Sequence, residues 1–138
     1  MVKRIILMGF IGLMTLSFGV AFAGPNLSPG NWEITTETEM PGMPMTAPPV
    51  THTQCLDQGE LVPQSEGAGQ ECHVSDIQVS GDTVSWKIVC GGQGGQMEGT
   101  GRITYSGDHL EGVMEMVITG AGMQVKNKIH GRRIGDCD

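Results

Sequence analysis

Three methionines lie within six residues of one another on a segment stiffened by prolines, Met40-Pro41-Gly42-Met43-Pro44-Met45, and His52 follows seven residues later. Thioether sulfur is a soft ligand that suits Cu(I), and the acidic chain attracts cations. One hypothesis is therefore a soft-metal site made of Met40, Met43, Met45 and His52. The alternative, which the sequence favours, is an apolar loop in which methionine serves as an adaptable packing residue.

A second set of residues shares the apolar face of the predicted strands, where glycines stand between large side chains. Glycines leave room and methionines adapt to varied shapes, and small barrels with such an interior can enclose an apolar ligand. The alternative is an ordinary filled core, so both interpretations remain open. The candidate ligand-binding residues are Trp86, Tyr105, Met97, Met114, Met116 and Met123.

Enzymatic activity is the least favoured class of function. The chain has no Gly-x-Ser-x-Gly elbow, and cysteines that form disulfides leave no thiolate nucleophile. The four histidines, His52, His73, His109 and His130, do not fall at metal-ligand spacing. The sequence thus predicts no catalytic residues and no cofactor.

The elements that position these side chains are predicted to be strands. Apolar and polar residues alternate in short segments that are separated by Gly, Ser, Asp and Pro, as is typical of antiparallel sheets. One apolar face recurs in every segment and must be hidden from water. We therefore predict an all-β fold, an antiparallel meander of about seven strands curled into a small barrel or half-barrel. The predicted strands are 31–40, 50–55, 73–79, 84–90, 97–105, 110–118 and 123–129.

Matching the apolar faces predicts the register of the hairpins. The turns at 80–82 and 106–109 set Val79 opposite Val84 and Tyr105 opposite Leu110. The same alternation sets Ile77 opposite Trp86, and His73 on the inward face beside Cys90. In the second hairpin it sets small residues opposite large ones, which is a sensible packing complement: Gly101 faces Met114, and Gly99 faces Met116.

Four cysteines, Cys55, Cys72, Cys90 and Cys137, indicate two disulfides in a short exported chain. The hairpin brings Cys72 near Cys90, which leaves Cys55 for Cys137. The rival pairing, Cys55 with Cys72 and Cys90 with Cys137, remains open.

The N-terminus has the three parts of a cleavable signal peptide. Lys3 and Arg4 precede an uncharged apolar run, and Ala21-Phe22-Ala23 supplies a small-x-small cleavage site. We expect residues 1–23 to be removed and residues 24–138 to form a single β domain. This predicts a periplasmic or secreted protein with no membrane anchor in its mature form. The net charge of −7 argues against nucleic acid as a partner and leaves a small apolar ligand or an envelope protein.

The sequence resembles the domain-of-unknown-function family 3617, a group of short exported bacterial proteins. The resemblance spans nearly the whole mature chain and implies an exported protein with no established catalytic residues. The segments that carry it are Pro29-Gly30-Asn31-Trp32-Glu33-Ile34, Met40-Pro41-Gly42-Met43-Pro44-Met45, Thr51-His52-Thr53-Gln54-Cys55-Leu56, Ser80-Gly81-Asp82 with Trp86, Thr104-Tyr105-Ser106-Gly107-Asp108 and Gly131-Arg132-Arg133-Ile134-Gly135-Asp136-Cys137.

Overall fold

The computed structural model describes residues 24–44, 46–64, 71–92 and 95–138 of the protein. The expected signal peptide, residues 1–23, and Met45 lie outside the described residues. Within the described ranges, no helix has the length and hydrophobicity needed to cross a membrane. The chain forms the strands β1 (Gly30–Glu39), β2 (Val50–Leu56), β3 (Glu71–Ser80), β4 (Thr83–Gly91), β5 (Met97–Ser106), β6 (His109–Ile118) and β7 (Met123–Gly135).

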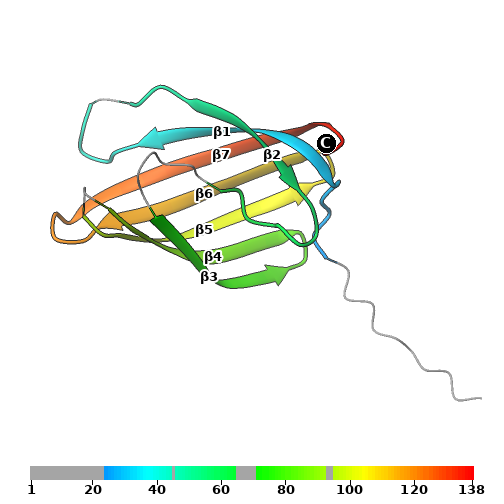
Figure 1. Cartoon of the computed structure of the whole chain (residues 1–138). Coiled ribbons are helices and arrows are strands. Elements are labelled where there is room, and N and C mark those ends of the chain that lie inside the picture. Colours follow the sequence, from blue (N-terminus) through cyan, green and yellow to red (C-terminus); the bar gives the residue numbers. More distant parts are fainter. Residues whose placement is uncertain (1–23, 45, 65–70, 93–94) are drawn as a thin grey trace, which may run out of the picture.

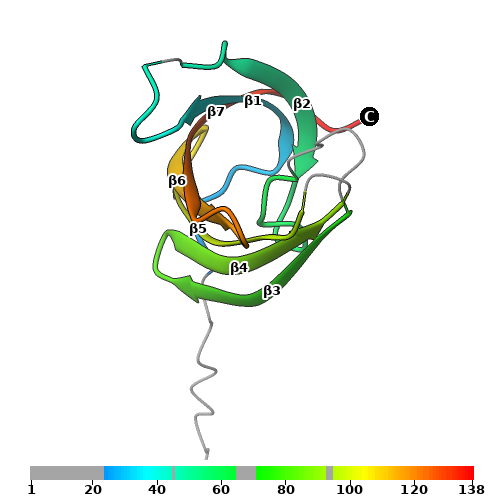
Figure 2. The same ribbon diagram turned by 90° about the vertical axis from the view of Figure 1, so that its left-hand side faces the viewer.

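All seven strands belong to one antiparallel sheet in the order β2-β1-β7-β6-β5-β4-β3. Strands β3 to β7 follow one another as hairpins, which confirms the predicted meander, while β1 pairs with the last strand, β7 (Figure 1). The sheet curls around its apolar face (Figure 2), and its edge strands β2 and β3 do not pair with each other. The described residues therefore form a half-barrel whose edge strands are β2 and β3.

The predicted register is confirmed in the β5–β6 hairpin. Tyr105 pairs with Leu110, Gly101 with Met114 and Gly99 with Met116. A one-residue slip would turn every side chain to the other face, so this agreement places the apolar set of both strands on the inside.

The β3–β4 hairpin keeps the predicted register only near its turn. Val79 pairs with Val84, but the register shifts between Ser75 and Gln78, so that Asp76 and Ile77 together oppose the single residue Trp86. Such a two-against-one arrangement is a β-bulge, and Asp76 has a positive φ of 51° there. The extra residue turns the first half of β3 over, and this has two consequences for the predicted pairing.

The first consequence corrects the prediction that His73 lies inward beside Cys90: His73 pairs with Val89, and Cys72 takes the position opposite Cys90. The second is that the two cysteines share a face and form a disulfide. The predicted apolar face of β3 is not buried, since Ile77 and Val79 are about half exposed at this free edge.

Both disulfides follow the first of the two predicted pairings. Cys72–Cys90 joins the edge strand β3 to β4, and Cys55–Cys137 ties the end of β2 to the C-terminus across 82 residues of sequence. Two disulfides indicate an oxidising, extracytoplasmic environment for the protein.

The core is concentrated toward one end of the half-barrel, which we call the closed end. The seven largest fully buried side chains lie from this end to the middle: Trp32, Tyr105, Ile34, Leu56, Ile103, Leu110 and Val84.

Two segments outside the sheet complete the closed end. The segment before β1 bonds to the β5–β6 turn through its backbone and places Leu27 in the core. The segment after β2 contributes Val62, and the Tyr105 hydroxyl donates a hydrogen bond of 2.6 Å to the Leu61 carbonyl. Trp32 and Tyr105 meet edge to face with ring centroids 6.1 Å apart, a favoured aromatic geometry.

The buried phenol of Tyr105 predicts a loss of stability at high pH. Burial raises the pKa of Tyr105 far above its usual value of about 10. Because the folded state prefers the protonated phenol, this contribution to stability is complete below pH ~10 and declines as the pH rises further. Tyr105 is the chain's only tyrosine, so near-ultraviolet absorbance of phenolate reports this group alone.

We expect the phenolate signal to appear only together with loss of the circular dichroism of the folded sheet. The Tyr105→Phe variant should lack the phenolate signal and show a weaker decline in stability above pH ~10. Ionisation of Tyr105 at an ordinary pKa in an intact fold would contradict the observed burial.

Candidate functional site at the open end

The opposite end of the half-barrel, where the inward-facing side chains are only half-buried, is the open end. It is formed by the last residues of β1, the β6–β7 turn and the first residues of β5. Its inward positions are methionine-rich: Met97 pairs with Ile118, and Ile118 pairs with Met123. Met97 and Met116 pack against the buried core. The interior therefore changes from a filled core to a half-buried apolar lining along the axis of the half-barrel.

The six predicted ligand-binding residues divide between these two regions. Trp86, Tyr105 and Met114 are at most 4% exposed and belong to the core. The other three, Met97, Met116 and Met123, are half-buried at the open end. The structure thus brings together only half of the predicted set in a place that a ligand can reach.

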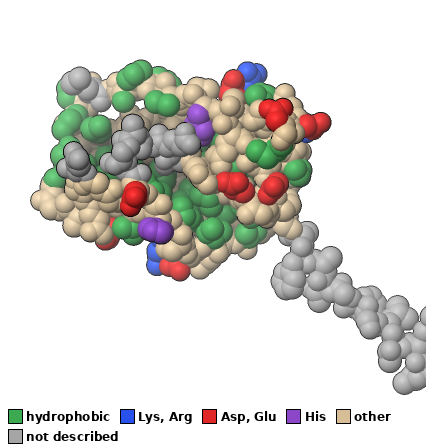
Figure 3. All heavy atoms as spheres, viewed as in Figure 1, with side chains coloured by type: hydrophobic (Ala, Val, Ile, Leu, Met, Phe, Trp, Pro, Cys, Tyr) green, Lys and Arg blue, Asp and Glu red, His purple; other side chains and the backbone are tan. Residues whose placement is uncertain are grey.

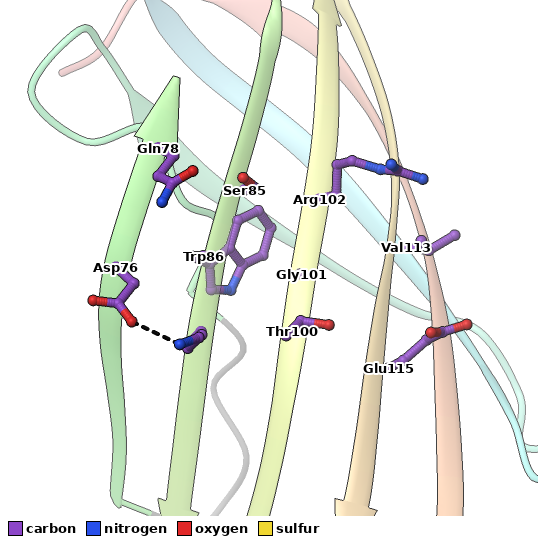
Figure 4. A pocket seen from close by; sticks show the side chains of 10 residues that line it. Asp76, Gln78, Ser85, Trp86, Thr100, Gly101, Arg102, Val113 and Glu115 are labelled. Atoms are coloured by element: carbon purple, nitrogen blue, oxygen red, sulfur yellow. Dashed lines mark ion pairs between the residues drawn. The ribbon is translucent and has the colours of Figure 1, made fainter. Parts of the chain in front are cut away.

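The room left by the inward glycines is occupied by neighbouring side chains. A Cβ atom at Gly101 would overlap the indole of Trp86, and one at Gly99 would overlap Met116. Figure 4 shows the indole lying beside Gly101 between β4 and β5. These glycines therefore permit close packing in the middle of the sheet, and the accessible apolar surface is at the open end.

Two buried nitrogen atoms have no hydrogen-bond partner among the described residues, Trp86 Nε1 and His52 Nε2. The buried polar side chain of Asn127 does have a partner, because its Oδ1 accepts a 2.8 Å hydrogen bond from the Thr38 hydroxyl. An unpaired buried donor such as the indole N–H of Trp86 lowers the stability of the fold. No other feature of the described residues accounts for its missing partner.

The outer face carries a polar pocket of about 460 Å³ whose lining includes Asp76, Ser85, Lys87 and Arg102 (Figure 4). Asp76 and Lys87 form an ion pair of 3.0 Å, and both side chains are more than half exposed. Exposed pairs of this kind contribute little energy. We therefore interpret this pocket as a solvated surface of the sheet.

Two of the predicted metal-binding methionines, Met40 and Met43, lie at the open end, but the predicted histidine does not. Met40, Met43 and Met123 line one pocket of about 340 Å³. His52 pairs with Ile34 in the ladder between β1 and β2. Ile34 lies six residues before Met40, which corresponds to a distance of roughly 20 Å along a strand. Met45 lies outside the described residues.

Met123 was predicted as a ligand-binding residue but not as a neighbour of Met40 and Met43. No local pattern could have shown this proximity, because it depends on the pairing of β1 with β7, in which Glu39 faces Lys126. Figure 3 shows hydrophobic side chains gathered over the end of the molecule where β1 finishes, while acidic side chains gather toward the other end.

The chain matches the family described as "Protein of unknown function (DUF3617)" over residues 27–137. The protein therefore belongs to this family, as its sequence motifs predicted. No curated protein and no solved structure matches the chain significantly.

Proposed function

We propose that the protein is a non-enzymatic, periplasmic or secreted binding protein that holds a small apolar ligand at the open end of its half-barrel. The observation that carries the proposal is the half-buried, methionine-rich lining there, which continues the buried core outward. Methionine side chains adapt to varied apolar shapes. A molecule seated there would bury apolar surface that the protein alone leaves half in water.

The free edge of the sheet extends this apolar surface. Val74 of β3 is 39% exposed, and its ladder partner Ile88, two residues before Cys90 at the open end, is buried in the core. An apolar ligand at the open end can therefore contact Val74 as well. An envelope protein is the alternative occupant of the same surface.

The state of the cysteines fits a binding role. The four cysteines are held in disulfides, which leaves no thiol nucleophile. The described residues contain no group of three or more His, Cys, Asp or Glu side chains arranged to hold a metal ion.

Binding of a fluorescent apolar probe, N-phenylnaphthylamine, tests the proposal. Met116 faces inward at the open end, and its neighbour Val117 faces outward and is 44% exposed. We expect Met116→Gln to weaken probe binding about tenfold, because the lost apolar burial of one such side chain is of the order of 1.5 kcal/mol or more. The matched change Val117→Gln should have little effect.

Thermal unfolding of both variants separates loss of the site from loss of the fold. Equal probe affinities for the two variants, or a wild-type protein that does not bind the probe, would contradict the proposal. Native mass spectrometry of the purified protein then distinguishes a retained small molecule from a co-purified envelope protein.

A further inference from the structure

We propose that Met40, Met43 and Met123 form a Cu(I) site composed only of thioether ligands. The three side chains come from two segments 80 residues apart in the sequence, the residues after β1 and the start of β7, and they line one pocket at the open end. This site shares Met123 with the apolar lining proposed above, but it depends on thioether sulfur, whereas apolar binding depends on hydrophobic surface.

The chemistry of the pocket selects a soft ion. Its other described lining residues are Pro41, Gly42, Gly122 and Gln124, so none of the described residues places a carboxylate, imidazole or thiolate in it. Hard cations such as Mg²⁺ and Ca²⁺ require oxygen ligands, and Zn²⁺ requires imidazole, thiolate or carboxylate. Thioether sulfur favours Cu(I). Because the cysteines of the chain are in disulfides, no thiolate competes for the ion.

The two segments that carry the methionines are held in place by their backbones. The Met43 amide donates a hydrogen bond of 3.1 Å to the Met40 carbonyl, and the Gly122 amide donates one of 3.1 Å to the Ile118 carbonyl. Gly42 and Gly122 have φ values of 94° and 64°, which favour glycine and fix the shape of both turns. The three flexible side chains can therefore converge on an ion from fixed positions.

The site is accessible for loading and release of the ion. Met43 is 50% exposed, so one ligand can reach toward solvent or toward another metal-binding molecule. The net charge of −7 raises the local concentration of cations around the protein.

The ligand set predicts an affinity that does not depend on pH between about 5.5 and 7. A thioether does not bind a proton in this range, whereas a histidine ligand with an ordinary pKa of about 6.5 would lose its metal as the pH falls. The set proposed from the sequence, which included His52, therefore behaves differently from the set proposed here.

The test is an anaerobic competition between the full chain, purified with its disulfides formed, and a chromogenic Cu(I) chelator. We expect one Cu(I) per chain, with equal affinity at pH 5.5 and 7 after correction for the protonation of the chelator. Met123→Leu should weaken binding by more than about tenfold, a loss that even changes outside the ligand shell cause at metal sites.

Two further variants serve as controls for the ligand set. Met97→Leu, at a half-buried position outside the pocket, and His52→Ala should leave the Cu(I) affinity unchanged. If Met123→Leu fails to fold, Met43→Leu tests the same claim at a half-exposed position.

Unchanged Cu(I) affinity in the Met123 and Met43 variants, weaker binding at pH 5.5, or no binding by the wild type would overturn the proposal. Met43 is not among the methionines of the apolar lining, so Met43→Leu should weaken Cu(I) binding and still bind N-phenylnaphthylamine. Failure of the metal site and failure of the apolar site are thereby distinguishable.

Discussion

Replacing Trp32 with alanine is expected to destabilise the protein by about 3–5 kcal/mol, as truncation of a large buried aromatic residue does. The Trp32 side chain is fully buried and contacts Tyr105 edge to face. Its indole nitrogen donates a hydrogen bond of 3.1 Å to the Ser28 carbonyl. The substitution therefore leaves a cavity and also removes a bond that holds the segment before β1 against the closed end.

Chemical denaturation of Trp32→Ala and Trp32→Phe measures this effect. We expect Trp32→Phe to lose less, because it keeps most of the apolar volume and the aromatic contact with Tyr105. A domain of this size has a total stability of about 5–15 kcal/mol, so the alanine variant should lose a large fraction of it. A loss below about 1 kcal/mol would show that the closed end is not the stabilising centre of the fold.

Removal of the Cys55–Cys137 disulfide is expected to be comparably damaging. The bond closes a loop across 82 residues, and the chain-entropy relation assigns such a loop about 4.5 kcal/mol of stabilisation. The Cys72–Cys90 bond spans 18 residues, for which the same relation gives about 3 kcal/mol. The pair Cys55→Ser/Cys137→Ser should therefore be less stable than the pair Cys72→Ser/Cys90→Ser.

Equilibrium denaturation of the two double variants, measured against the wild type, decides this order. Replacing both cysteines of a bond avoids a free thiol that could form a wrong pairing. If the Cys72/Cys90 variant is the less stable of the two, then the bond that holds the edge strand β3 acts through local packing rather than through the entropy of loop closure.

The β3–β4 hairpin shows where sequence alternation stops being informative. The pattern from Val79 back to His73 predicted an unbroken strand, because polar and apolar residues alternate regularly near the turn. The extra residue at Asp76 and Ile77 reverses the faces beyond that point. The cysteine pair is the one signal that indicated the bulge. Cys72 can lie opposite Cys90 on the same face only if β3 has one extra residue between Cys72 and the turn.

The regular hairpins were predictable because each has one apolar face and a short turn, as the pairing of Tyr105 with Leu110 confirms. The division of the interior into a closed and an open end was not predictable. It depends on where Leu27 and Val62, which lie outside the strands, enter the core. The grouping of Met123 with Met40 likewise depends on a strand pairing between distant parts of the chain.

The position of β1 in the sheet has a consequence for the order in which the chain can fold. β1 lies between β2 and β7, and Arg132 bonds to Glu33 across 99 residues of sequence. A chain is synthesised from its N-terminus, so the residues of β1 and β2 are made long before the 13 residues of β7. Until β7 is synthesised, Trp32 and Ile34 remain exposed to water, and Cys55 has no partner with which to form its disulfide. Completion of this sheet therefore depends on the last of its strands to be synthesised.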